Sequence, residues 1–474
     1  MRTSLTKPSP RIQRLLKTAK KDLGQGLCPV EIYSDPEILE LELERIFNRC
    51  WIFVGHVSEI PKRGDFVVRR IGRDSFIVVR DDADRIRCLL NVCRHRGLPV
   101  CTTEQGNAPR FRCPYHSWTY RNTGEWIGAP EMQRAYGGAR AADWGLLQAP
   151  QVDSYQGLIF ACLDSSAPAL REYLGDICFY IDCALGLHPE GMEVSGEPYR
   201  FKIAGNWKSA AENNVAGDSY HPMQLHQFDE QVGFQASSSQ GAYQSHQGAY
   251  DMMRPVVVNA GHTLLASPPW VRNTIWGYPD EVSRAFAFDK LSAAQRRWLA
   301  KWQFVVCGVF PSFFIFRGAT KPEPSNPEMP YYPSTHIGTM HPDSAGVMEH
   351  WIWHLSWKFE PEHYKELSYR ALVIGAGSTG AYMQDDCRAW RCGFNGGQSL
   401  FARQNRMRFN LQLGMPDVTQ IEEVPRAEWP GPAKVVYKGG LTDALLRTFY
   451  GRWLELMLED ARPVRASRST RAAK

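Results

Sequence analysis

Residues 93–118 read CRHRGLPVCTTEQGNAPRFRCPYHSW and place two cysteine–histidine pairs in one short segment. Cys93 pairs with His95 as C-x-H, and Cys113 pairs with His116 as C-x-x-H, with 17 residues between the pairs. A connection of that length lets the chain turn back, so that the two pairs can meet. Thiolates and imidazoles are ligands that soft and borderline metal ions prefer. The segment therefore predicts a metal centre held by two loops.

The order of these ligands separates two kinds of centre. Zinc fingers usually place two cysteines together and two histidines together. A Rieske [2Fe-2S] cluster instead needs two thiolates on one iron and two imidazoles on the other. Two loops that each offer one cysteine and one histidine meet that need, so we predict this cluster, with zinc as the alternative. Its predicted ligands are Cys93, His95, Cys113 and His116.

The sequence around the loops predicts an α+β protein in several parts. The short β-branched runs DFVVRRI, SFIVVR and RIRCLLNV are typical of a small antiparallel β domain. After it, helical stretches alternate with strand-like ones, which indicates a larger α+β domain. Asp35 followed by Pro36 is typical of a helix start. The expected parts are an N-terminal helical segment packing on the larger domain (1–47), the cluster domain (48–165), the larger domain (166–460) and a basic flexible tail (461–474).

Composition excludes several function classes. The net charge of +5 comes partly from the two basic ends, of which the first 21 residues also read as a flexible tail, and no interior basic run predicts nucleic-acid binding. No apolar run is long enough for a signal peptide or a membrane span. Twelve cysteines without regular spacing indicate reduced thiols and a cytoplasmic protein. We therefore expect neither a nucleic-acid partner nor a membrane.

A glycine-rich stretch, GAGSTG at 375–380, fits the dinucleotide fingerprint literally, and RALVI before it looks like a strand. That fingerprint also requires an acidic residue about 20 positions further on. No Asp or Glu occurs from Cys387 through Pro416. We therefore expect no bound NAD or flavin and interpret the glycines as a flexible turn.

A second candidate site lies in GDSYHPMQLH, at 217–226. Two imidazoles and one carboxylate on one face of a metal form the facial triad of mononuclear Fe(II) sites. His221 and His226 supply the imidazoles, and a carboxylate should come from elsewhere in the chain. Residues five apart on a regular helix point in different directions, so we expect an irregular backbone around Pro222.

The motifs CRHRG and CPYHSW resemble those of the Rieske non-haem iron ring-hydroxylating oxygenases, and AYMQDD resembles the third-ligand segment of that family. The resemblance implies that Asp386 is the third iron ligand, with Asp385 as the alternative. It also implies that Asp218 links the cluster histidine of an adjacent chain to His221. One residue more than usual separates Glu212 from this aspartate, which leaves open whether Asn213 or Asn214 lies near the iron.

The resemblance further implies a function and partners. The expected protein is the α subunit of a terminal oxygenase, with a helix-grip-like antiparallel sheet in its catalytic domain. It would take electrons from a ferredoxin or reductase and add O2 to an aromatic hydrocarbon or aromatic acid, giving a cis-dihydrodiol. A monooxygenase or demethylase is the first alternative, and an electron-transfer protein without oxygenase activity is the second. The C-terminal RTFYGRWLELM resembles subunits that pair with a small β subunit, so α3β3 is expected and α3 is the alternative.

The substrate is the least determined part of the prediction. Several aromatic residues are candidates for an apolar pocket, and Arg317 is a candidate for binding a substrate carboxylate. The aromatic candidates are Phe304, Phe310, Phe313, Phe314, Phe316, Trp351, Trp353, Trp357 and Tyr382. The remaining histidines have no ligand-like neighbours and are interpreted as ordinary: His56, His188, His246, His262, His336, His341, His350, His354 and His363.

Overall fold

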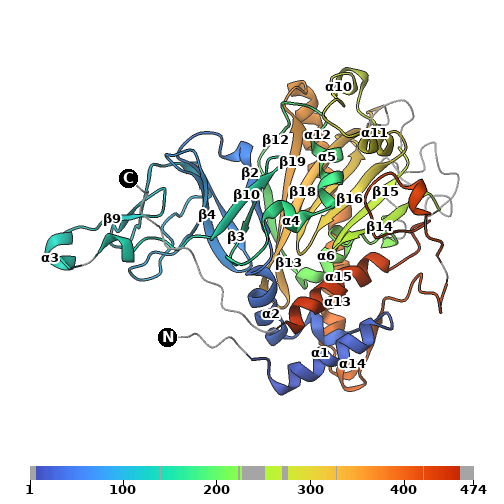
Figure 1. The fold of residues 1–474 in the computed structure, drawn as a ribbon, viewed down its shortest axis with the longest axis horizontal. Helices are drawn as coiled ribbons and strands as arrows, with labels where there is room; N and C mark the ends of the chain where they lie inside the picture. The colour runs from blue at the N-terminus through green and yellow to red at the C-terminus, as the bar shows by residue number, and fades with distance from the viewer. Residues whose placement is uncertain are drawn as a thin grey trace. The chain divides into compact units, whose positions relative to one another are not determined.

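The computed structural model describes residues 7–138, 140–221, 225–226, 251–269, 276–326, 328–419 and 421–459. The described chain forms two compact units (Figure 1). The first is built from Leu43–Tyr173, and the second from Thr6–Glu42 together with Leu174–Asp460.

The first unit consists of three small antiparallel sheets. The runs DFVVRRI, SFIVVR and RIRCLLNV form neighbouring strands of one of them, as predicted. The four-stranded sheet has the order β5-β4-β3-β6, with β3 Asp65–Ile71, β4 Asp74–Arg80, β5 Ile86–Leu90 and β6 Gln105–Asn107. The other two are β10-β11-β2 (Gln151–Tyr155, Leu158–Cys162, Ile52–His56) and β7-β8-β9 (Arg110–Arg112, Thr119–Arg121, Trp126–Gly128). The first cysteine–histidine loop follows β5, and the second connects β7 to β8.

The second unit is built on one large antiparallel sheet. Its order is β12-β19-β18-β17-β16-β15-β14-β21, and β13 also pairs with β19. The strands are β12 Met192–Val194, β13 Tyr199–Ala204, β14 Arg254–Asn259, β15 His262–Ser267, β16 Gln303–Val309, β17 Phe313–Thr320, β18 Tyr332–Ser344, β19 Val347–Trp357 and β21 Val435–Val436. The strands β17, β18 and β19 are long and almost entirely buried, so they form part of the core of this unit.

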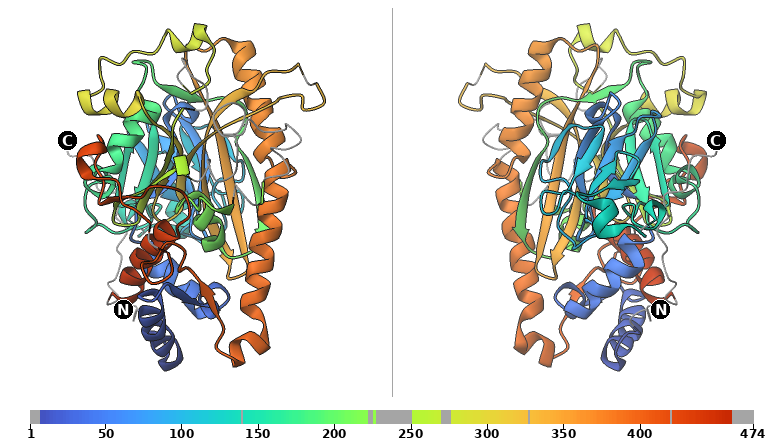
Figure 2. Two further views of the ribbon diagram at one scale, coloured as in Figure 1. Left: turned by 90° about the vertical axis from the view of Figure 1, so that its right-hand side faces the viewer. Right: turned by 90° about the vertical axis from the view of Figure 1, so that its left-hand side faces the viewer.

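Two long helices, α12 (Glu362–Ala376) and α13 (Ala381–Gln398), run along this sheet, as the orange column in Figure 2 shows. The hydroxyl of Thr320 on β17 donates to the carbonyl of Ala371 on α12 at 2.8 Å, which ties α12 to the sheet. The stretch RALVI lies inside α12, so the expectation of a strand there is wrong, and the glycines that follow join two helices. Without a preceding strand, GAGSTG lacks the local structure that a dinucleotide site requires.

The N-terminal residues correct another expectation. Residues Pro10–Leu23 form helix α1 instead of a flexible tail, and the hydroxyl of Ser9 caps its start by accepting from the N–H of Ile12. Ile12 and Leu16 are buried on one side, while the basic residues stay on the other. The predicted helix at Pro36 is present as α2 (Pro36–Glu42), and the side chain of Asp35 accepts from the N–H of Glu37. The predicted basic tail at 461–474 lies outside the described residues.

The C-terminal helix α15 (Ala444–Leu458) covers its own unit. Its residues Phe449, Tyr450 and Trp453 are fully buried, and the helix contacts α1 and β14. The shorter elements are β1 Leu27–Pro29, η1 Val30–Tyr33, η2 Leu43–Phe47, η3 Val57–Glu59, α3 Met132–Tyr136, η4 Ala141–Asp143, α4 Leu170–Leu174, α5 Ile177–Leu185, α6 Trp207–Asn214, α10 Asp280–Ser283, α11 Ala293–Leu299, α14 Leu400–Gln404, β20 Arg408–Asn410 and η5 Arg426–Glu428.

A fully buried ion pair holds helix α6 in place. The carboxylate of Glu42 accepts from the ammonium of Lys208 at 2.7 Å and from the indole N–H groups of Trp207 and Trp453 at 2.8 and 2.7 Å. Burial of a charged pair is tolerated where the remaining lone pairs are also satisfied, as they are here. The contact joins α2, α6 and α15 within the second unit, and α6 is the helix that carries Glu212 and the two candidate asparagines.

Candidate metal centres

Both cysteine–histidine loops of the first unit have the same backbone geometry. In each loop the cysteine N–H donates to the carbonyl five residues later, at 2.8 Å for Cys93 and 2.9 Å for Cys113. Each cysteine carbonyl accepts from the N–H four residues later, at 2.9 and 3.0 Å. That fourth residue has a positive φ in both loops, +81° at Gly97 and +58° at Ser117. The two loops therefore hold their cysteines at equivalent positions, whereas the histidine follows two residues after the cysteine in one loop and three residues after it in the other.

The two histidine rings of these loops come together as the motif predicts. The ring centroids of His95 and His116 lie 4.5 Å apart. The ring of Trp118 stacks on His95 at 5.1 Å, with an interplanar angle of 4°, which fixes the orientation of the imidazole. Within the described part of the chain, the buried Nδ1 atom of His95 has no hydrogen-bond partner. A buried nitrogen of this kind fits a metal ligand, because unpaired buried polar atoms are otherwise costly.

The sulfur atoms of the two loops have a defined hydrogen-bonding environment. The hydroxyl of Tyr120 lies 3.4 Å from Cys93 Sγ and accepts from the N–H of Arg94 at 3.1 Å. Burial raises the pKa of Tyr120, so its hydroxyl stays protonated and can donate to the sulfur. Burial also raises the pKa of the Cys113 thiol, and its contact with Cys93 adds to this. A thiolate at Cys113 is therefore favoured by a compensating positive charge, which the iron of a cluster would provide.

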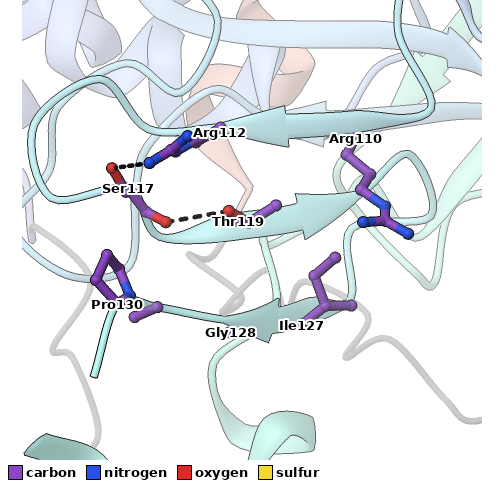
Figure 3. Close-up of a pocket in the computed structure, with 8 residues that line it drawn as sticks. Arg110, Arg112, Ser117, Thr119, Ile127, Gly128 and Pro130 are labelled. Carbon is purple, nitrogen blue, oxygen red and sulfur yellow. Dashed lines mark hydrogen bonds between the residues drawn. The ribbon is translucent and has the colours of Figure 1, made fainter. Parts of the chain in front are cut away.

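A surface hollow of about 490 Å³ lies next to the second loop (Figure 3). Its wall is formed by β7, β8 and β9, and two arginines, Arg110 and Arg112, contribute to it. Arg112 donates to the hydroxyl of Ser117, the residue after His116, at 2.9 Å. The neighbourhood of the predicted cluster is therefore basic on this side.

The second unit brings His221, His226 and Asp386 together. One ligand atom from each of the three lies within 4.8 Å of the others. Asp386 Oδ1 lies 3.7 Å from His221 Nε2 and 3.4 Å from His226 Nε2. Two imidazole nitrogens and one carboxylate oxygen at such distances have the composition of the facial triad that binds Fe(II) in oxygenases.

The backbone before His221 positions the first of the two histidines. Helix α6 ends at Asn214, and residues 215–220 are not helical. The side chain of Asp218 accepts from the N–H of Tyr220 at 2.9 Å, and its carbonyl oxygen lies 3.0 Å from His221 Nδ1. That contact favours a proton on Nδ1 and leaves Nε2, the atom facing Asp386, able to bind a metal. Pro222, at which the irregularity was predicted, lies outside the described residues.

The geometry distinguishes between the alternatives at the third ligand and the neighbouring amide. Asp386 lies on the buried side of α13, whereas Asp385 takes no part in the cluster of three. Asn213 Nδ2 donates to Asp386 Oδ1 at 3.2 Å. The side chain of Asn214 instead bonds to the carbonyl of Ala210, within its own helix. Asn213 is therefore the amide that touches the candidate site.

Comparison with known proteins bears on the identity of the chain. The model of the Rieske [2Fe-2S] domain matches residues 50–155, which include both cysteine–histidine loops. The α subunit of an N,N-dimethyl phenylurea N-demethylase from Sphingobium sp. (strain YBL2) is 36% identical over 86% of this chain and 88% of its own length. The biphenyl 2,3-dioxygenase α subunit of Rhodococcus jostii (strain RHA1) is 30% identical over 92% and 90%. The chain belongs to the large α subunits of the Rieske non-haem iron oxygenases.

A solved structure supports the same assignment. Naphthalene 1,2-dioxygenase from Rhodococcus sp., bound to indole, matches with a TM-score of 0.85 and 34% identity over 95% of this chain and 99% of that one. The predicted fold class and the Rieske domain are thereby confirmed, and zinc is no longer needed as an alternative. In the described part of this oxygenase subunit, no helix has both the length and the apolar character needed to cross a membrane.

Sequence reasoning missed the tyrosines that surround Glu212 of this Rieske oxygenase subunit. The hydroxyls of Tyr33 and Tyr450 both donate to Glu212 Oε1, and they lie 2.6 Å from each other. Burial raises the pKa of Glu212 to about 7, against the lowering effect of the two hydroxyls. The peptide N–H of Asp218 donates to the carbonyl of Glu212 at 3.1 Å, so this network supports the segment that leads to His221. The partners lie far apart in sequence, and no local signal connects them.

Proposed function

We propose that this chain is the terminal oxygenase component of a multicomponent system that oxygenates an aromatic compound with O2 and electrons from a ferredoxin or reductase. The single observation that carries the proposal is the convergence of His221, His226 and Asp386 in a chain that also contains a Rieske domain. A Rieske domain alone moves electrons, whereas a second metal site provides a place for substrate chemistry. An electron-transfer protein would have no need of such a cluster of ligands.

The proposed cluster ligands are Cys93, His95, Cys113 and His116, and the proposed Fe(II) ligands are the three residues of the second unit. An Fe(II) ion held there would supply the site at which O2 is reduced, while the cluster would deliver electrons one at a time. The ring of Trp118 holds His95 in orientation by stacking on it. Asn213 orients the carboxylate of Asp386, because its amide donates to one oxygen of that group.

Asp218 is the proposed link between the two metal sites of neighbouring chains. Its Oδ1 accepts from the backbone N–H of Tyr220, and its Oδ2 lies 3.7 Å from His221 Nδ1. The carboxylate is partly exposed, and so is the ring of His116. We propose that Asp218 of one chain accepts a hydrogen bond from His116 of the next, which requires a ring of subunits, α3β3 or α3.

Two reactions fit this proposal. Addition of both atoms of O2 to adjacent ring carbons, with two electrons and two protons, would give a cis-dihydrodiol, as the names of the dioxygenase relatives suggest. Insertion of one atom of O2 into a C–H bond of an N-methyl group, with two electrons and two protons reducing the other atom to water, would give an N-hydroxymethyl group. Its C–N bond then breaks to release formaldehyde and the N–H product, a demethylation as the name of the 36% identical relative suggests. The same metals serve both reactions, and the position of the substrate decides between them.

The test begins with the purified protein under anaerobic conditions. About three iron ions and two sulfide ions per chain, with a rhombic paramagnetic resonance signal after reduction, are expected of an oxygenase subunit. About two iron ions would instead indicate an electron carrier. Incubation with ¹⁸O2, an electron source and either naphthalene or N,N-dimethyl-N′-phenylurea then separates the reactions, because a doubly labelled dihydrodiol indicates dioxygenation and formaldehyde indicates demethylation. No oxygenated product from either compound, with both metals bound, would contradict the proposal.

A further inference from the structure

Three histidines of the large sheet lie on the face covered by α12 and α13. His336 on β18 is directly opposite His354 on β19, and His350 lies four residues before His354 on β19, on the same face of the sheet. The ring of His350 stacks on Trp390 of α13, the helix that also carries Asp386. The ring of Phe314 lies 6.1 Å from His336 and 5.9 Å from His350. His336 therefore belongs to the same packed layer as the candidate iron site.

The three histidines differ in how their ring nitrogens are satisfied. His354 has a partner at each nitrogen: Ser368 Oγ at 3.0 Å from Nε2 and Ser356 Oγ at 3.5 Å from Nδ1. In the described part of the chain, neither ring nitrogen of His350 has a hydrogen-bond partner, but this residue is completely buried and stacked with the rings of Phe201 and Trp390, so a substrate has no access to it. Within the described residues, His336 keeps a buried Nδ1 without a hydrogen-bond partner, yet its side chain retains 6% exposure. A buried imidazole nitrogen without a partner costs free energy unless something else satisfies it.

The surroundings of His336 indicate what could satisfy this nitrogen. The ring of Phe316 lies 4.7 Å from His336, and Phe316 is the one residue of β17 that is not buried. Tyr382 on α13 is also partly exposed, and its ring lies 5.4 Å from that of His226. Burial lowers the pKa of His336 to about 3, with smaller contributions from His354 and His350, so the imidazole is neutral. A neutral imidazole offers one donor and one acceptor.

The only cation named earlier as a candidate for a substrate carboxylate, Arg317, points to the other side. Adjacent residues of a strand face opposite sides of a sheet, so Arg317 and Phe316 project in opposite directions. Arg317 is fully buried against Trp276 and donates to the hydroxyl of Thr335 at 2.7 Å. It therefore does not supply positive charge beside His336, which disfavours a carboxylate at that position.

We propose that His336 recognises an uncharged hydrogen-bonding group, the carbonyl or N–H of an aryl amide or aryl urea, on the aromatic substrate. This inference rests on the proposed oxygenase function and names the substrate class for it. The aromatic ring of the substrate would lie against Phe316, while the amide or urea would pair with the ring nitrogen of His336. A plain hydrocarbon would leave that nitrogen unpaired, so the site discriminates against it.

The experiment measures anaerobic binding by calorimetry with the metal-loaded protein. The probes are N,N-dimethyl-N′-phenylurea and naphthalene, and the variants are His336→Phe and His336→Gln. We expect wild type to bind the phenylurea, and His336→Phe to bind it about tenfold more weakly with naphthalene binding retained. His336→Gln, which keeps a donor and an acceptor, should stay within about twofold of wild type. His350→Phe is the matched control, because its ring nitrogens also lack partners among the described residues but the residue is completely buried, and the ratio of the two affinities should not change.

Three results would overturn the inference. They are failure of wild type to bind the phenylurea, unchanged phenylurea binding in His336→Phe, and an equal loss of both compounds in that variant. Turnover on the same samples separates this inference from the proposed function. An active oxygenase whose preference does not depend on His336 refutes the inference alone, whereas selective binding without any oxygenated product refutes the proposed function alone.

Discussion

Replacement of Tyr120 by phenylalanine tests how the first unit sets the reduction potential of its cluster. The hydroxyl of Tyr120 lies 3.4 Å from Cys93 Sγ, and the N–H of Arg94 donates to the same hydroxyl. Because the hydroxyl oxygen of Tyr120 accepts from Arg94, its proton is available for donation to Cys93 Sγ. Reduction adds negative charge to the cluster, so a hydrogen bond to a ligand sulfur stabilises the reduced form more than the oxidised form.

The size of the effect follows from the value of one hydrogen bond. A single intramolecular hydrogen bond contributes roughly 0.5–1.5 kcal/mol net. For transfer of one electron, about 1.4 kcal/mol corresponds to about 59 mV. The Tyr120→Phe variant should therefore have a midpoint potential lower by roughly 20–60 mV, because the bond's contribution to the reduced form is lost.

The assay is a spectroelectrochemical titration of the cluster absorption in purified protein. Tyr136→Phe is the matched control, because Tyr136 packs edge-on against His95 and Trp118 through its ring. The control should keep the wild-type potential. An unchanged potential in Tyr120→Phe, or an equal decrease in both variants, would refute the assignment of the effect to the sulfur contact.

The remaining predictions concern the second unit. Asp218→Ala should keep both metals bound but lose turnover, measured by iron counting and product formation on one sample, and retained turnover would contradict its bridging role. Asn213→Ala should weaken iron retention by roughly ten- to hundredfold in dialysis against a chelator, whereas Asn214→Ala, whose side chain bonds within its own helix, should not. Glu42→Gln should lower the free energy of unfolding by about 3–5 kcal/mol in denaturant titrations, because Lys208 is left as an uncompensated buried charge. Glu42→Leu combined with Lys208→Met should recover part of that loss, and no recovery would show that the charge is not the cause.

The Rieske domain was predictable from sequence because all four proposed cluster ligands lie within a short segment. The types and order of Cys93, His95, Cys113 and His116 distinguish a Rieske cluster from a zinc site without any tertiary information. The proposed third ligand of the candidate iron site is different, because Asp385 and Asp386 are neighbours in the sequence. Only the packing of α13 decides that Asp386 faces the two histidines.

The N-terminal segment was expected to be a flexible tail because it is rich in basic residues, but its few apolar residues have the spacing of one side of a helix. Ile12, Leu16 and Ala19 lie on one side of α1 and are buried, although basic residues dominate the segment. A narrow apolar stripe of this kind is enough when another helix is available to cover it. Contact between α1 and α15 supplies that cover, and its availability cannot be deduced from residues 10–23 alone.

Which side chains of β17 face the proposed substrate depends on the alternation of side chains between the two faces of the sheet. Phe316 and Arg317 are adjacent in sequence, and both appear as candidates for substrate contact when only residue type is considered. The pairing of β17 with β18 puts Phe316 opposite His336 and puts Arg317 opposite Thr335, on the other side of the sheet. A shift of the register by one residue would exchange these faces and place a buried cation beside the iron layer. In the proposed site, strand register therefore decides between a neutral and an anionic substrate group, and the sequence of β17 alone does not specify that register.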